Sequence, residues 1–152
     1  MEIERKFLVK TVPSQLEQYP CRQIEQAYLC TNPVIRLRRQ DDEYILTYKG
    51  HGMMVREEYN LPLTKEAYEH LLPKADGTVL AKKRYLIPLS DGLTAELDLF
   101  EKAFSGLRLV EVEFPDEQTA HSFCPPDWFG EDVTYSKDYH NSTLSRLTGY
   151  QA

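Results

Sequence analysis

The sequence lacks both common phosphate-binding loops and any long apolar run. Neither GxxxxGK(S/T) nor GxGxxG occurs in its 152 residues, so a bound phosphate would have to be held by side chains. No stretch is long and apolar enough to span a bilayer, and no apolar signal segment follows Met1. We therefore expect a cytoplasmic protein without a membrane segment, and not a nucleotide-binding fold built on a glycine-rich loop.

Cysteine is also scarce, and acidic residues outnumber basic ones. The three cysteines, Cys21, Cys30 and Cys124, have no metal-binding spacing, and we expect them to be reduced thiols. With 24 acidic and 18 basic residues, the formal net charge is −6. Because sequence-independent binding to DNA or RNA depends on neutralising phosphates, this balance argues against a nucleic-acid partner. It leaves room for a local basic site.

What the sequence does contain is a series of short strands. A hydrophobic content of 41% fits one folded domain over residues 1–152. Eight segments are predicted strands: 2–9, 24–30, 34–40, 43–49, 55–61, 79–88, 93–101 and 107–114. Four short helices are predicted at 14–19, 64–72, 116–123 and 140–147. The short turns between strands predict an α+β, mainly β, protein whose antiparallel sheet curls or closes into a barrel.

One face of almost every predicted strand is ionisable. Residues two apart in a strand share a face. A solvated face would explain any single pair, since antiparallel sheets commonly expose one polar side. Such faces usually mix Thr, Ser, Gln and Lys, whereas here most strands repeat one charge type. The aligned residues are Glu2, Glu4 and Lys6; Arg36 and Arg38; Thr47 and Lys49; Arg56, Glu58 and Asn60; Lys82 and Arg84; Glu96 and Asp98; and Glu111 and Glu113.

These faces would make chemical sense inside a barrel. Crowded carboxylates raise one another's pKa unless a cation lies between them, and oxygen ligands select hard ions such as Mg²⁺ or Mn²⁺. Crowded Arg and Lys side chains require an anion, and the Arg fork suits phosphate. A metal-chelated polyphosphate would supply both the cation that the carboxylates need and the anion that the basic side chains need. A porin-like barrel is disfavoured by the predicted helices and by charges on the opposite faces, at Arg5, Arg39 and Glu57.

The spacing at Glu2, Glu4 and Lys6 resembles the E-x-E-x-K signature of the CYTH family, also called triphosphate tunnel metalloenzymes. Further motifs resemble the family in the same order: "EQAYL", "IRLRR", "LTYKG", "REEYNL", "KKRY" and "ELDLF" followed by "LRLVEVEF". The resemblance implies a closed eight-stranded antiparallel β-barrel, a tunnel with a charged lumen and short flanking helices. Its similarity to short bacterial members implies metal-dependent hydrolysis of inorganic triphosphate to pyrophosphate and phosphate.

The resemblance also implies roles for individual residues. Two divalent ions, Mg²⁺ or Mn²⁺, would be held by Glu2, Glu4, Asp98, Glu111 and Glu113. Phosphoryl oxygens would be held by Lys6, Arg36, Arg38, Lys49, Arg56 and Arg84. Lys82 lies among cations that should depress its pKa, so we predict that it carries a proton, with Tyr28 as its partner.

The chain departs from the family pattern mainly near its C-terminus, where "SKDYHN" stands for D-x-R-Y-x-N. Lys137 is a candidate for the positive charge missing at Asp138. The four histidines, His51, His70, His121 and His140, fall in predicted turns or helices without a matching partner for serine-type nucleophilic catalysis. Three alternatives stay open. The chain could process ATP or thiamine triphosphate, could bind polyphosphate without turnover, or, least favoured, could carry apolar ligands. The expected partner is a small-molecule triphosphate, and the protein could be a monomer or a homodimer.

Overall fold

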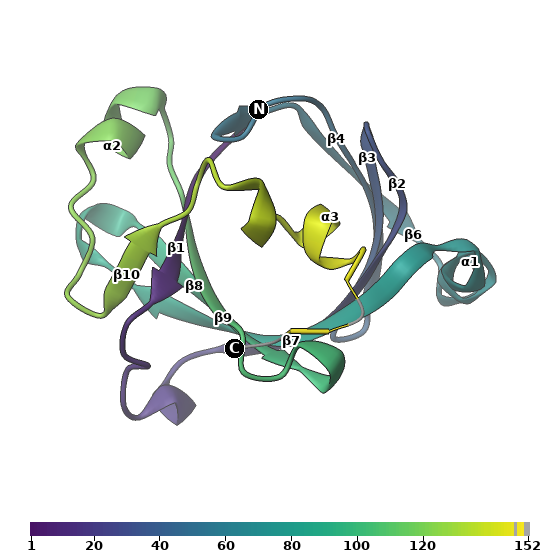
Figure 1. Cartoon of the computed structure of the whole chain (residues 1–152), viewed down its shortest axis with the longest axis horizontal. Helices are drawn as coiled ribbons and strands as arrows, with labels where there is room; N and C mark the ends of the chain where they lie inside the picture. The colour runs from purple at the N-terminus through teal and green to yellow at the C-terminus, as the bar shows by residue number, and fades with distance from the viewer. Residues whose placement is uncertain (148, 151–152) are drawn as a thin grey trace.

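In a computed structural model that describes residues 1–147 and 149–150, one antiparallel sheet curls into a ring of strands (Figure 1). The predicted single domain of residues 1–152 includes 148 and 151–152, which lie outside the described part. The strands are Glu2–Val9 (β1), Cys21–Thr31 (β2), Val34–Gln40 (β3), Glu43–Lys49 (β4), Val55–Arg56 (β5), Glu58–Leu63 (β6), Asp76–Pro88 (β7), Thr94–Glu101 (β8), Arg108–Glu113 (β9) and Phe129–Asp132 (β10).

The stretch that contains β5 and β6 closes the ring. The order along the sheet is β10-β1-β9-β8-β7-β2-β3-β4-β6, while β5 pairs with β1. Only Glu57 separates β5 from β6, so this stretch joins β4 to β1 and completes the ring. The result is the nearly closed antiparallel barrel expected from the sequence. The predicted strand 55–61 is therefore two strands, because its ends pair with different neighbours.

Short helices lie around and across the barrel. They are Lys65–Leu71 (α1), Glu117–Ser122 (α2) and Asn141–Leu144 (α3), with 3-10 turns at Leu16–Gln18, Leu72–Lys74, Ser90–Gly92, Lys102–Phe104 and Lys137–Tyr139. Thr64 caps α1 as predicted, since its Oγ1 accepts a hydrogen bond from Ala67 N at 3.0 Å. The helices predicted at 14–19 and 140–147 were too long: a 3-10 turn forms in the first, and α3 covers only part of the second. No helix in the described part of the chain is long and apolar enough to cross a membrane.

The core lies in two places. One apolar cluster packs on the outer face of the barrel, where Phe7, Val110 and Val112 lie beneath Ala120 of α2 and Phe129 of β10. β10 was not predicted, because four residues after a proline-rich turn carry no readable periodicity. It pairs with the C-terminal half of β1.

The second cluster fills one end of the lumen, the space enclosed by the barrel. On β7, β8 and β9 the inward positions change from charged to apolar, ending at Leu80, Phe100 and Leu109. Leu144 of α3 packs against the same cluster. The charged part of the lumen is therefore backed by apolar side chains at this end, and the fold confines the ionic residues to the rest.

Candidate active site in the barrel lumen

Charged side chains from eight strands line one cavity in the lumen. The cavity encloses about 730 Å³ when the open solvent at its mouth is included. Eleven of the thirteen predicted site residues line it: Glu2, Glu4, Lys6, Tyr28, Arg36, Arg38, Lys49, Arg56, Arg84, Glu111 and Glu113. The other two, Lys82 and Asp98, are almost fully buried behind the lining. The structure thus brings the ionic faces of the strands together on the inside of the barrel.

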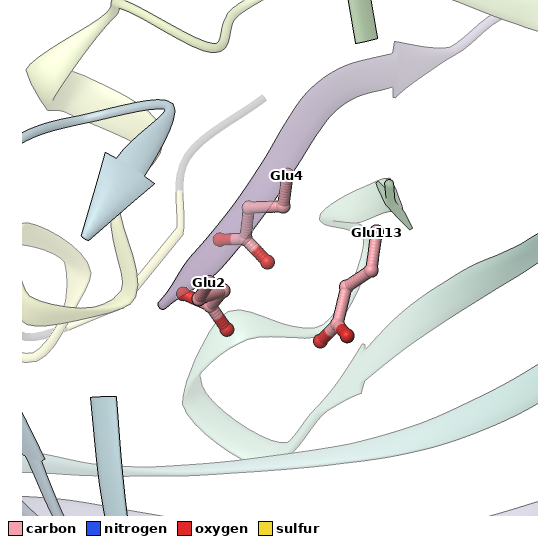
Figure 2. A group of neighbouring side chains, drawn as sticks. All are labelled: Glu2, Glu4 and Glu113. Atoms are coloured by element: carbon pink, nitrogen blue, oxygen red, sulfur yellow. The ribbon is translucent and has the colours of Figure 1, made fainter. Parts of the chain in front are cut away.

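Three carboxylates form a cluster at one side of the cavity (Figure 2). An oxygen of each of Glu2, Glu4 and Glu113 lies within 4.8 Å of the others. Glu2 and Glu4 are two residues apart on β1, and Glu113 lies opposite Glu4 on β9. The backbone of Glu4 is held by a hydrogen bond from its N–H to the carbonyl of Met54, at 3.0 Å. We call these three residues the acid triad.

The acid triad has too little positive charge around it. Burial raises the pKa of Glu2 to about 7, and a hydrogen bond shared with Glu58 adds to this, although Lys49 Nζ lies 2.9 Å from Glu2. Burial and the nearby Glu111 raise the pKa of Glu4. Burial, Glu58 and Glu111 raise the pKa of Glu113. These surroundings disfavour the charged form of all three carboxyl groups. A bound cation would therefore stabilise the site.

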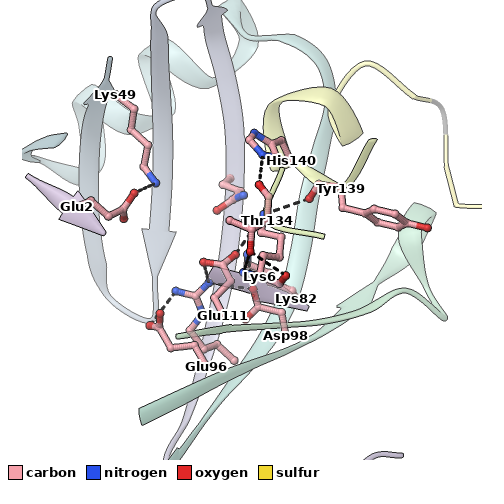
Figure 3. A network of polar contacts seen from close by, with 12 residues as sticks. Glu2, Lys6, Lys49, Lys82, Glu96, Asp98, Glu111, Thr134, Tyr139 and His140 are labelled. Atoms are coloured by element: carbon pink, nitrogen blue, oxygen red, sulfur yellow. Dashed lines mark hydrogen bonds and ion pairs between the residues drawn. The ribbon is translucent and has the colours of Figure 1, made fainter. Parts of the chain in front are cut away.

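The other two predicted metal ligands are already paired with cations (Figure 3). Asp98 accepts hydrogen bonds from Arg84 Nε at 2.8 Å and Nη2 at 2.9 Å, and Lys82 Nζ lies 2.7 Å away. Glu111 lies 3.5 Å from Lys6 Nζ and 3.9 Å from Arg84 Nη2. Burial alone would raise the pKa of both carboxyls, but these cations lower it. The five predicted ligands therefore form two groups with different surroundings.

A cationic wall on β3 faces the cavity. Arg38 donates from Nε and Nη2 to Gln26 Oε1 on β2, at 3.2 and 2.8 Å, which fixes its guanidinium. Arg36 donates to Thr47 Oγ1 at 3.2 Å, and its buried Nε has no partner in the described residues. Burial, together with the nearby charges of Arg36 and Arg84, lowers the pKa of Arg38 to about 9. The wall therefore holds positive charge that an anion would stabilise.

The two proposed proton carriers have different neighbours in the described part of the chain. Tyr28 lies opposite Arg36 and lines the cavity, whereas Lys82 lies opposite Ile24 and binds Asp98. No hydrogen bond joins Tyr28 to Lys82 in the part of the chain that the structure describes. The pKa of Lys82 is lowered to about 7, as expected in direction, but burial is the first cause and the neighbouring arginines add to it.

Some residues in and around the cavity were given no role from the sequence. Gln26 lies outside the lining but shares the inward face of Tyr28, so the period of two could have identified it. Glu96 was aligned with Asp98 in the sequence but was not assigned to the site, and it lines the cavity. The C-terminal segment offered no such signal. It brings Thr134, His140, Asn141 and Ser142 to the cavity, and Lys6 Nζ donates to the carbonyl of Tyr139 at 3.1 Å. Lys137 and Asp138 are exposed and do not line the cavity.

Known proteins share this chain's sequence and fold along nearly its whole length. The CYTH domain family matches residues 1–145. An inorganic triphosphatase of Nitrosomonas europaea is 45% identical over 148 residues, covering 95% of this chain and 96% of that protein. An inorganic triphosphatase of Acetivibrio thermocellus is 33% identical, covering 94% and 92%. The crystal structure of an inorganic triphosphatase superposes with a TM-score of 0.73 at 40% identity, covering 99% of this chain and 97% of that one.

Proposed function

The chain belongs to the CYTH family, and from this membership and the geometry of its lumen we propose that it hydrolyses inorganic triphosphate to pyrophosphate and phosphate. One observation carries the proposal: a carboxylate cluster and a cationic wall line the same cavity. The cluster would be stabilised by a cation and the wall by an anion. A metal-chelated triphosphate supplies both charges at once. Two relatives that match along almost their whole length carry the name inorganic triphosphatase.

Substrate would be held by the basic side chains of the cavity. The proposed contacts are Lys6, Arg36, Arg38, Lys49, Arg56 and Arg84. Planar guanidinium groups bind two phosphoryl oxygens at once, and the half-buried site strengthens each contact relative to water. Fixed cations also stabilise charge on the phosphoryl group during transfer, at no cost of reorganisation. Gln26 would keep Arg38 in the orientation that this binding needs.

The acid triad fits a hard divalent ion. Glu2, Glu4 and Glu113 offer only oxygen ligands, as Mg²⁺ and Mn²⁺ prefer, and their raised pKa values indicate unmet negative charge. When bound, such an ion neutralises phosphate charge and activates water. A second ion remains part of the proposal, with Glu111 and Asp98 as its ligands. These two carboxylates would first have to exchange the cations that they now bind.

We keep Lys82 as the proposed proton carrier, because its pKa of about 7 suits proton transfer near neutral pH. A Lys82→Met variant is expected to lose about 100-fold in kcat, as is typical for loss of general acid–base help. Arg84 keeps both hydrogen bonds to Asp98, so KM for triphosphate should change little. Phosphate release under saturating triphosphate measures the effect. Lys83→Met, on the exposed face one residue away, is the control. Full turnover by Lys82→Met would leave Lys82 only a structural partner of Asp98.

The function is tested by phosphate release from inorganic triphosphate with Mg²⁺, Mn²⁺ or Ca²⁺, with ATP and thiamine triphosphate measured beside it. We expect metal-dependent turnover of triphosphate to exceed that of either larger substrate, and pyrophosphate to appear in equal amount with phosphate. Preferred turnover of ATP or thiamine triphosphate would identify the alternative enzyme. Binding of triphosphate without turnover under any of the three ions would identify a binding module.

A further inference from the structure

The C-terminal segment supplies one side of the cavity. Residues 133–147 cross the opening of the barrel in Figure 1, and the lining residues of this segment come from Thr134 and from His140 to Ser142. Among these side chains only His140 can carry positive charge. Lys137, the candidate from sequence, is exposed and lies outside the lining.

The hydrogen bonding of His140 determines which ring nitrogen can meet a ligand. Nε2 lies 3.4 Å from the carbonyl oxygen of Thr134 (Figure 3). A carbonyl only accepts, so Nε2 carries the proton and donates it. Thr134 is itself fixed, because its Oγ1 accepts from the N–H of Lys6 at 3.0 Å and its own N–H donates to Asp132 at 2.9 Å. No partner is recorded for Nδ1 within the described residues.

The charged groups around His140 come from three strands. Lys6 on β1 and Arg56 on β5 repel a protonated ring, while Glu111 on β9 attracts it. Burial, then Lys6 and less strongly Arg56, lower the pKa of His140, while the hydrogen bond to the Thr134 carbonyl and the attraction of Glu111 oppose this in part. The ring is therefore mainly neutral in the free protein near pH 7. A polyanion placed among Lys6, Arg56 and His140 would reverse this balance by favouring the charged ring.

We propose that His140 is a further substrate-binding residue, which takes up one proton from solvent when inorganic triphosphate binds and donates from Nδ1 to a phosphoryl oxygen. Nε2 remains bound to Thr134 throughout, so the imidazolium bridges the C-terminal segment and the substrate. The inference rests on the proposed function for the identity of the anion. It adds a contact whose strength depends on pH, unlike the contacts of the arginines.

The test is calorimetric titration of the full chain with inorganic triphosphate at pH 6.5 and 8.5. The buffer contains a metal chelator and no added metal. His140→Gln should bind about tenfold more weakly than wild type at pH 6.5, as expected for loss of one charge-assisted hydrogen bond. At pH 8.5 the two should differ by less than about twofold, because the wild-type ring is costly to protonate there. Titrations in two buffers of different ionisation enthalpy should show that wild type takes up more protons than His140→Gln does.

Two further variants keep the test decisive. His140→Arg should bind tightly at both pH values, because its charge does not titrate, and Lys137→Gln should match wild type. Equal binding by wild type and His140→Gln at pH 6.5, equal proton uptake, or a deficit of the same size at both pH values would overturn the inference. So would failure of the wild type to bind metal-free triphosphate. His140-dependent binding without hydrolysis after addition of Mg²⁺ would overturn only the proposed function.

Discussion

Changing both Glu2 and Glu4 to Gln is expected to reduce metal-dependent phosphate release by about 10³-fold, since a bound metal supplies several kcal/mol of charge stabilisation. The two residues supply most of the acid triad, and a neutral amide binds Mg²⁺ or Mn²⁺ far more weakly than a carboxylate does. Phosphate release over a range of Mn²⁺ concentrations measures the loss. Adding more metal should restore little of the activity, because the ligand oxygens no longer carry charge.

The same double variant should remain folded. Both carboxyls have raised pKa values in the folded protein, so it binds more protons than the unfolded chain between pH 4.5 and about 7. Their charges therefore oppose folding increasingly as pH rises through this window. Without metal at pH 8, the variant should melt no lower than wild type. Glu57→Gln with Glu131→Gln removes the same charge from exposed positions and should keep full activity. Unfolding of the Glu2 and Glu4 variant, or activity equal to this control, would count against the metal site.

Changing both Arg36 and Arg38 to Gln should lower kcat/KM for triphosphate by about 10³-fold, mostly through KM, because each charged hydrogen bond contributes about 1.5–3 kcal/mol. Both side chains lie on the inward face of β3 and line the cavity. Steady-state kinetics at saturating Mg²⁺ separates KM from kcat.

Arg39→Gln is the matched control, because Arg39 adjoins Arg38 in sequence but is exposed on the outer face. It should leave both constants unchanged. A double variant of Arg36 and Arg38 that kept its KM would contradict the assignment of β3 as a phosphate-binding wall. An equal loss in the Arg39 control would instead indicate a general electrostatic effect of net charge.

The inward position of the charges could be predicted because the period of two is a local property of each strand. Glu2 and Glu4 share a face whatever the strand pairs with, and so do Arg36 and Arg38. Closure of the sheet then brings faces of the same kind into one lumen. The bounds of the predicted strands agree with the structure to within a few residues for the same reason, apart from the break at Glu57, whereas β10 was not predicted.

The pairing of charges depends on register, which the sequence does not display. Asp98 lies directly opposite Arg84, and this register explains why Asp98 binds cations of β7 instead of joining the acid triad. The side of the cavity that the C-terminal segment forms was not predicted, for a related reason. Lys6 contacts Tyr139 across more than a hundred residues of chain, in a segment with no periodic pattern. Contacts of this kind become visible only in the folded structure.

The central claim is that the lumen binds a metal-chelated triphosphate between the acid triad and the cationic wall. Anomalous diffraction from crystals containing Mn²⁺ and an imido-bridged triphosphate analogue tests it most directly. We predict a manganese peak among Glu2, Glu4 and Glu113, and the phosphate chain against Arg36 and Arg38. Manganese or the analogue bound only outside the lumen, with the acid triad free of metal, would contradict the account.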